Sequence, residues 1–248
     1  MTALQPPSEK RPASRDSAII IPVYNHGRQI GEVLRQTLQL GLPVFVVNDG
    51  STDTTAEILE AMSGINVLHH PFNRGKGAAI LTGLATARDK GHTIAITLDG
   101  DGQHKPEDVW NLLNALEDGE RCIVVGKRQG MVRGRNVPWT SRFGRHFSNF
   151  WVWVSGGLWL ADSQTGFRLY PIQETLGLKI KARRYQFEVE VLVKATQRGI
   201  GIREAAVQVV YQKQGERISH FRPWLDFWRN STTFCRLIFY RIFKFFRP

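Results

Sequence analysis

The chain has 248 residues, of which 42% are hydrophobic and 22% charged, so it is long enough to bury the core of one domain. Its formal net charge of +11 predicts an anionic partner without choosing between nucleic acid, acidic lipid and a phosphorylated substrate. The two cysteines, Cys122 and Cys235, lie far apart, which disfavours a disulfide framework or a paired-cysteine metal site and fits a reducing compartment.

The ends of the chain differ in character from its middle. Residues 1–16 are polar, contain three prolines and lack an apolar stretch, so we expect a disordered leader and a cytoplasmic protein. Residues 17–212 are expected to form the catalytic domain. Residues 213–248 form a basic and aromatic segment with eight Lys or Arg against two acidic residues. Most of the charge excess therefore lies at the C-terminus.

Between residues 18 and 126, apolar runs alternate with segments of helical period, which predicts an α/β fold with a mostly parallel sheet flanked by helices. The expected strands are 18–24, 44–48, 67–69, 93–99 and 122–126, and the expected helices are 30–40, 52–62, 77–90 and 107–116. After residue 126 the alternation stops. The later chain contains a basic stretch, an aromatic run at 147–160, a turn at 162–166, a helix at 187–198 and a strand at 202–210.

In such a sheet, ligands bind beyond the carboxyl ends of the strands, so we expect the segments 24–26, 49–51 and 99–101 to converge. Asp99 and Asp101 follow a strand and are flanked by glycines, so their two carboxylates can hold Mg²⁺ or Mn²⁺ on a diphosphate. Taken alone, an Asp-x-Asp pair is more often a plain polar loop. Asp49 can accept from a base or ribose, or cap the next helix.

Residues 73–77, NRGKG, open a helix, so backbone N–H groups and two cations can face an anion there. The glycine spacing is not that of a P-loop.

Six segments in order, IIIPVYN, VVNDGSTD, NRGKGAA, LDGDGQHKPED, VVGKR and DSQTGFRLY, resemble glycosyltransferase family 2. The likeness is to its dolichyl- and polyprenyl-phosphate mannose or glucose synthase branch, and it spans about residues 18–219. It implies a GT-A fold, an inverting reaction and a donor such as GDP-mannose or UDP-glucose.

The resemblance also implies roles for individual residues. The metal ligands are Asp99, Asp101 and Gln103, with Asp101 also catalytic; the residues that hold the nucleotide sugar are Pro22, Tyr24, Asn25, His26, Asp49, Gly75, Lys76, Asp99, Gly100 and Asp101. The acceptor and phosphates are expected to contact Arg128, Ser141, Arg142, Gln164, Arg217, Ser219 and Arg222. His26 stands where the family often has Glu, which puts the donor's identity in doubt. Structural ion pairs and a tight turn are the alternatives for the arginines and for residues 162–168.

The acceptor decides whether a base is needed. A polyprenyl phosphate is already anionic, so catalysis then reduces to positioning and charge stabilisation, with Arg128 contributing. A hydroxyl on another lipid requires a carboxylate base, for which Asp162 and then Glu188 are the candidates.

The C-terminal stretch 234–246 carries apolar residues on one side of a helix and cations on the other, and it is too short and too charged to span a bilayer. We expect amphipathic helices lying on an anionic membrane, at the cytoplasmic face of the inner membrane. The alternative is a helix packed on the domain's own core, and Trp151, Trp153 and Trp159 share that ambiguity. No nucleic-acid-binding motif is recognisable, and the oligomeric state stays open.

Overall fold

The computed structural model describes residues 16–117, 119–129, 149–156, 158–209 and 231–239. The strands are β1 (Ser17–Val23), β2 (Val44–Asn48), β3 (Ile65–His69), β4 (Ile94–Thr97), β5 (Ile123–Gln129), β6 (Arg168–Pro171) and β7 (Ile202–Gln208). The helices are α2 (Gly27–Leu38), α3 (Thr55–Glu60), α4 (Lys76–Asp89), α5 (Val109–Asn114), α7 (Ile172–Gly177) and α8 (Gln186–Gln197), with a 3₁₀ turn η1 (Pro106–Asp108). Residues 149–154 and 231–239 are also helical.

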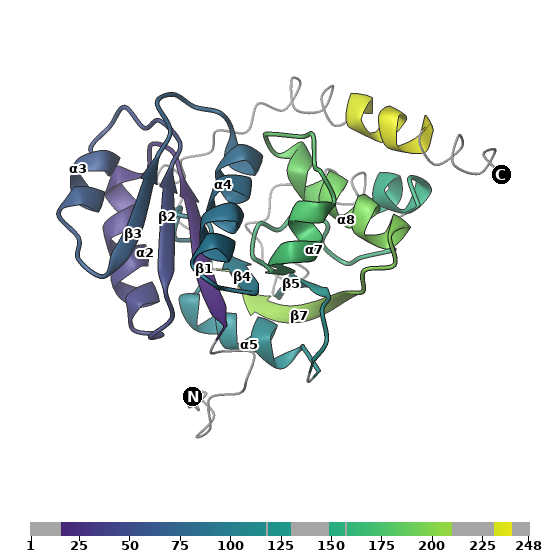
Figure 1. Ribbon diagram of the computed structural model, residues 1–248, viewed down its shortest axis with the longest axis horizontal. Coiled ribbons are helices and arrows are strands. Elements are labelled where there is room, and N and C mark those ends of the chain that lie inside the picture. The colour runs from purple at the N-terminus through teal and green to yellow at the C-terminus, as the bar shows by residue number, and fades with distance from the viewer. Residues whose placement is uncertain (1–15, 118, 130–148, 157, 210–230, 240–248) are drawn as a thin grey trace.

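The seven strands form one sheet in the order β3-β2-β1-β4-β6-β5-β7 (Figure 1). Strands β3, β2, β1 and β4 are parallel neighbours, with Val23 of β1 opposite Asn48 of β2. β6 runs antiparallel to both β4 and β5, whereas β5 and β7 are parallel. The expected mostly parallel α/β sheet is therefore confirmed, with one reversed strand in the middle.

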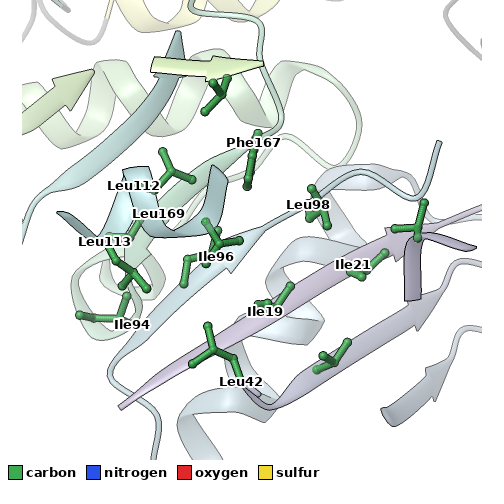
Figure 2. Packing of buried hydrophobic residues seen from close by; sticks show 14 of the residues in the cluster. Ile19, Ile21, Leu42, Ile94, Ile96, Leu98, Leu112, Leu113, Phe167 and Leu169 are labelled. Atoms are coloured by element: carbon green, nitrogen blue, oxygen red, sulfur yellow. The ribbon is translucent and has the colours of Figure 1, made fainter. Parts of the chain in front are cut away.

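Helices cover both faces of the sheet because the strands are apolar on both sides. On β1, Ile19 and Ile21 point into a core shared with α2, α3 and α5, part of which is drawn in Figure 2. Ala18 and Ile20 point the other way, into a core shared with α4, α7 and α8. Burial on both faces gives the continuous apolar runs of β1 and β2 that predicted a parallel sheet.

Several predicted bounds were wrong in detail. Helix α3 begins at Thr55 rather than at Thr52, because Asp53 accepts from the backbone N–H groups of Gly27 and Thr55 and holds this turn in the loop. Strand β5 runs on to Gln129, so Arg128 lies within a strand rather than after it. β6 and α7 were not predicted.

The helix at 231–239 packs on the domain over the described part of its length. Phe234 and Leu237 are buried with Val152, Val189 and Val193, in a cluster that joins this helix to α8 and to residues 149–154. These two residues thus follow the alternative of packing on the protein's own core. The remaining residues of the expected amphipathic stretch, 240–246, lie outside the described part, as do residues 1–15 and 210–230.

The cationic side of this helix is also partly engaged. Arg236 donates to Glu190 at 2.8 Å, and Glu190 is fully buried. Glu190 also accepts from Lys194 at 2.8 Å and from the backbone of Lys181 and Ala182. Burial opposes ionisation of Glu190, but these donors together hold its pKa below the ordinary value. Arg236 therefore anchors the helix to the domain, although 44% of its side chain is exposed.

Among the described residues, none of the helices combines the length and apolar character needed to cross a membrane.

Candidate active site

The loops that follow β1 and β2 are joined by side-chain hydrogen bonds. The backbone N–H of Asn25 donates to Ser51 Oγ at 3.0 Å, and Asn25 Oδ1 accepts from the backbone of Thr52 at 2.8 Å. The backbone N–H of His26 donates to Thr55 Oγ1 at 3.0 Å. The expected convergence of segments 24–26 and 49–51 is thus present. Pro22 is buried at the end of β1, and Tyr24 is half-buried just beyond it.

Asp49 connects these loops to the start of α4. Its Oδ1 accepts from the backbone of Arg74 at 2.9 Å and from His70 Nδ1 at 2.6 Å, while Oδ2 accepts from the backbone of Gly75 at 2.7 Å. Gly75 has φ of 98°, and a Cβ there would lie 2.5 Å from the carbonyl oxygen of Arg183. Asp49 therefore fixes the loop at 73–75. It has this structural role whether or not it also binds a nucleotide.

Lys76 pairs with two carboxylates from distant parts of the chain. Its Nζ lies 2.8 Å and 3.0 Å from the two oxygens of Asp99, and 2.7 Å from Glu188 Oε1. Burial alone disfavours the ammonium, but Asp99 and Glu188 raise the pKa of Lys76 well above its ordinary value. Burial alone raises the pKa of Asp99, yet the ammonium, with smaller effects of His104 and His26, holds it below the ordinary value. Lys76 and Asp99 therefore form a charged pair.

Asp101 lies beside Asp99 in the same acidic loop. Its Oδ1 accepts from the backbone N–H of Gln103 at 3.0 Å, which closes a tight turn in the loop. Burial, and next the negative charge of Asp99, raise the pKa of Asp101. The buried Gly100 separates the two carboxylates, and Gln103 is half-buried next to them.

The three residues expected to bind metal fit a hard cation by their chemistry. Two carboxylates and an amide oxygen are the donor types that Mg²⁺ and Mn²⁺ accept, and a cation would relieve the repulsion between Asp99 and Asp101. In the described part of the chain no group of three or more His, Cys, Asp or Glu side chains is arranged to hold a metal. A cation held here would therefore share its coordination with an amide, water or substrate oxygens.

Gly166 forms the wall against which Lys76 and Asp99 pack. A Cβ at this position would lie 2.3 Å from Lys76 Nζ and 2.6 Å from Asp99 Oδ2. The carbonyl oxygen of Gly166 accepts from Thr97 Oγ1 at 2.6 Å, so the wall is tied to the end of β4. The sequence placed residue 166 in a turn, but it did not predict this contact.

A methyl group at position 166 is therefore expected to displace the Lys76–Asp99 pair. We expect Gly166→Ala to lower kcat/KM for sugar transfer about 100-fold, the scale of a misplacement of about 1 Å. Gly177→Ala is a suitable control, because a Cβ there meets nothing within 4 Å. Steady-state rates of both purified variants, with thermal melts to show folding, test this. Equal rates for the two variants would refute the steric effect of the methyl group.

Arg128 and Asp162 form a bidentate ion pair. Arg128 Nη2 donates to Asp162 Oδ1 at 2.9 Å, and Nε donates to Oδ2 at 2.5 Å. Asp162 is buried, whereas the Arg128 side chain keeps 19% of its surface exposed. Asp162 Oδ1 also accepts from the backbone of Gln164 at 3.3 Å. The structural ion pair that was the alternative for Arg128 is therefore present.

Arg168 holds the loop 162–167 in place through buried hydrogen bonds. It is fully buried and donates to the carbonyl oxygens of Ser163 at 2.7 Å, Thr165 at 2.8 Å and Glu188 at 2.7 Å. Asn149 accepts a hydrogen bond from the backbone of Ser163 in this loop and donates one to the carbonyl oxygen of Ala161 just before it. One arginine thus fixes both the loop that carries Asp162 and the first turn of α8, which carries Glu188.

The remaining expected acceptor residues, Ser141, Arg142, Arg217, Ser219 and Arg222, lie outside the described part of the chain. The nearest described residue before the last three is Val209, which pairs with His104 in an isolated antiparallel bridge. His104 follows Gln103 and is buried, and this burial lowers its pKa. Val209, the residue after β7, therefore lies beside the acidic loop.

An exposed aromatic surface lies apart from this polar site. It consists of Phe150, Trp153 and Trp159, whose side chains are 44%, 53% and 62% exposed. The rings contact one another, with centroids 6.3 Å apart for Phe150 and Trp153 and 6.2 Å for Trp153 and Trp159. Trp151 is half-buried against Phe234 instead. Trp151 thus follows the alternative of packing on the domain's own core, whereas Trp153 and Trp159 are exposed.

The sequence is similar to a known protein family and to several of its members. Residues 18–172 match the family described as Glycosyl transferase family 2. The UDP-N-acetylglucosamine–dolichyl-phosphate N-acetylglucosaminyltransferase of Methanococcus voltae is 28% identical, over 78% of this chain and 85% of the relative. The polyprenol monophosphomannose synthase of Mycolicibacterium smegmatis is 27% identical, over 84% of this chain and 82% of the relative.

Among solved structures, the mannosyl-3-phosphoglycerate synthase of Rubrobacter xylanophilus superposes with a TM-score of 0.59. The alignment covers 92% of this chain and 74% of that one, with 16% sequence identity, and it bears on the fold alone.

Proposed function

Because the chain belongs to glycosyltransferase family 2, we propose that it transfers a hexose from a nucleotide sugar to a polyprenyl phosphate, with inversion and with a divalent metal. The fold is of the GT-A type and the chain is a glycosyltransferase; the donor, the acceptor, the metal and the stereochemistry are the proposal. The observation that carries the proposal is that both candidate bases are paired with cations. Asp162 pairs with Arg128, and Glu188 pairs with Lys76. Lys76 also pairs with Asp99, which with Asp101 forms the acidic part of the site.

The donor is assigned to the edge where β1, β2 and β4 end. The nucleotide lies against Tyr24, Asn25 and the loop fixed by Asp49, and the donor diphosphate faces Asp99 and Asp101. Asp99, Asp101 and Gln103 would hold Mg²⁺ or Mn²⁺, which neutralises charge on the departing diphosphate. Arg128 offers a second cation. GDP-mannose and UDP-glucose are the donor types proposed.

The ion pairs of Asp162 and Glu188, the two candidate bases, favour an acceptor that is already anionic. Asp162 accepts from Arg128 through both oxygens, and Glu188 accepts from Lys76 at 2.7 Å. A carboxylate oxygen that already accepts from a cation is not free to take the proton of a hydroxyl nucleophile, and such a nucleophile needs a carboxylate that can. A polyprenyl phosphate needs none. The names of both relatives, which concern dolichyl phosphate and polyprenol monophosphate sugars, support the same acceptor class.

The test is transfer of labelled hexose from a panel of sugar nucleotides to a total lipid extract, followed by mild acid. A lipid-phosphate sugar is cleaved by mild acid, whereas an ordinary glycoside survives. We expect an acid-labile lipid product from one donor. An acid-stable product would instead establish transfer to a lipid hydroxyl, the alternative that requires a base.

We also assign the protein to the cytoplasmic face of the membrane as a peripheral protein. Trp153, Trp159 and Phe150 form an exposed aromatic surface, a feature that in soluble proteins marks an interaction site. Tryptophan side chains favour the interface between headgroups and hydrocarbon. The net charge of +11 favours an anionic leaflet.

Replacing both exposed tryptophans is expected to weaken membrane binding. We expect Trp153→Ala/Trp159→Ala to lower the partition coefficient for vesicles rich in anionic lipid by about 100-fold or more, at about 1.5–3 kcal/mol per buried aromatic side chain. Phe72→Ala is the control, because Phe72 is 66% exposed on a different loop. Vesicle co-sedimentation measures the partition. Unchanged binding of the double variant would contradict this surface assignment.

A further inference from the structure

The Lys76 ammonium pairs with two carboxylates of the site. It donates hydrogen bonds to Asp99 Oδ2 at 3.0 Å and to Glu188 Oε1 at 2.7 Å, and its Nζ also lies 2.8 Å from Asp99 Oδ1. Only 19% of the Lys76 side chain is exposed, with 22% for Asp99 and 7% for Glu188. This is a buried three-membered ion cluster, and it is formed by the protein's own side chains.

The same Asp99 oxygens are those assigned to the metal. A divalent ion binds a carboxylate oxygen at about 2.0–2.1 Å, so an ion at Asp99 and an ammonium that chelates both Asp99 oxygens are close neighbours of like charge. The surroundings also restrict the ammonium. Gly166 closes one side so tightly that a single methyl group would overlap both Lys76 Nζ and Asp99. Lys76 therefore cannot leave Asp99 toward Gly166.

We propose that Lys76 is a positioning residue that competes with the divalent metal for Asp99, and that the donor diphosphate provides the new partner for its ammonium. This inference rests on the proposed function. In the ligand-free protein Lys76 neutralises Asp99 and weakens the metal site. A diphosphate bound beside the start of α4 offers Lys76 oxygens in place of Asp99, which is then available to the metal. Metal and donor therefore bind cooperatively.

The measurement is binding of Mn²⁺ alone to the full chain, followed by electron paramagnetic resonance of the free ion, with no nucleotide present. We expect Lys76→Met to bind Mn²⁺ about tenfold more tightly than the unmodified protein, within the range typical of coupling between two sites. Lys76→Arg retains the positive charge and is expected to remain weak. Lys90→Met is the matched control, because Lys90 is an exposed lysine at the end of the same helix and its loss changes net charge equally.

Lys76→Met leaves two buried carboxylates without their cation, so a second pair of variants protects against a folding defect. Glu188→Gln keeps Lys76 on Asp99, whereas Lys76→Met/Glu188→Gln frees Asp99 without leaving an unpaired Glu188. We expect the double variant to bind Mn²⁺ about tenfold more tightly than Glu188→Gln, by the same coupling. Circular dichroism establishes that both proteins are folded.

Equal Mn²⁺ affinity with and without Lys76 in both comparisons would overturn the proposal, and so would an equal gain in Lys90→Met. Failure of the proposed function is read separately. A chain that transfers no sugar to a polyprenyl phosphate can still bind Mn²⁺ more tightly once Lys76 is removed. A chain that transfers sugar while Lys76→Met leaves Mn²⁺ affinity unchanged retains its function and loses only this inference.

Discussion

Asp101→Asn is expected to abolish most sugar transfer while leaving the fold intact. The Asn side chain keeps an oxygen for the backbone N–H of Gln103, so the turn of the acidic loop is preserved. It removes a negative charge that would hold the proposed metal ion, and we expect kcat to fall about 1,000-fold, the scale for loss of one charge-stabilising group. Steady-state transfer assays at saturating donor measure the change.

The same substitution is expected to leave stability unchanged or to raise it, although it lowers activity. Burial and the charge of Asp99 raise the pKa of Asp101, so its ionised form destabilises the folded protein at neutral pH. This cost is absent at low pH, where the carboxyl is protonated, and appears as pH rises through the raised pKa. Asp101→Asn should therefore be at least as stable at neutral pH as the unmodified chain. Asp89→Asn, with a side chain 66% exposed, controls for the substitution.

If Asp101→Asn kept near-normal turnover, the acidic loop would not be the metal and diphosphate site. If it lost activity together with stability, the loss would reflect misfolding, and the interpretation of Asp101 as a strained, functional carboxylate would be wrong.

Arg168→Met is expected to destabilise the protein severely. It would leave the carbonyl oxygens of Ser163, Thr165 and Glu188 without their buried donor. Unsatisfied buried groups cost about 1–3 kcal/mol each, so we expect the free energy of unfolding to drop by about 4 kcal/mol or more. Urea denaturation followed by tryptophan fluorescence measures it.

Two companion variants make this prediction specific. Arg168→Lys retains the charge but cannot reach three carbonyl oxygens at once, so it should recover only part of the loss. Arg88→Met removes an arginine whose side chain is 48% exposed and should change stability by less than about 0.5 kcal/mol. A loss of similar size in Arg168→Met and Arg88→Met would contradict the structural role of Arg168.

The strands and the acidic loops were predictable because their signals are local. The continuous apolar runs of β1 and β2 follow from burial on both faces, and the rule that ligands bind at the carboxyl ends of strands correctly predicted that the segments 24–26 and 49–51 converge. β6 was missed for an equally physical reason. It has four residues, begins with Arg168 and ends with Pro171, a composition that favours a turn unless a buried arginine finds carbonyl partners.

The pairing of the charged side chains could not be predicted from the sequence. Lys76 lies 23 residues from Asp99 and 112 from Glu188, and Arg128 lies 34 from Asp162. Each of these residues was identified as a candidate on its own. The local sequence does not indicate that Glu188 pairs with Lys76 or that Asp162 pairs with Arg128. The same applies to Arg236 and Glu190, whose ion pair turns part of an expected membrane helix into a packed element. These pairings depend on tertiary structure alone.

The proposed acceptor is a lipid phosphate whose own charge makes a base unnecessary. The most direct test offers the purified protein undecaprenyl phosphate and undecaprenol in parallel, with the same labelled sugar nucleotide and Mn²⁺. These lipids differ only in the phosphate. We predict a labelled product from undecaprenyl phosphate and none from undecaprenol; transfer to undecaprenol, with undecaprenyl phosphate inert, would contradict the proposed acceptor.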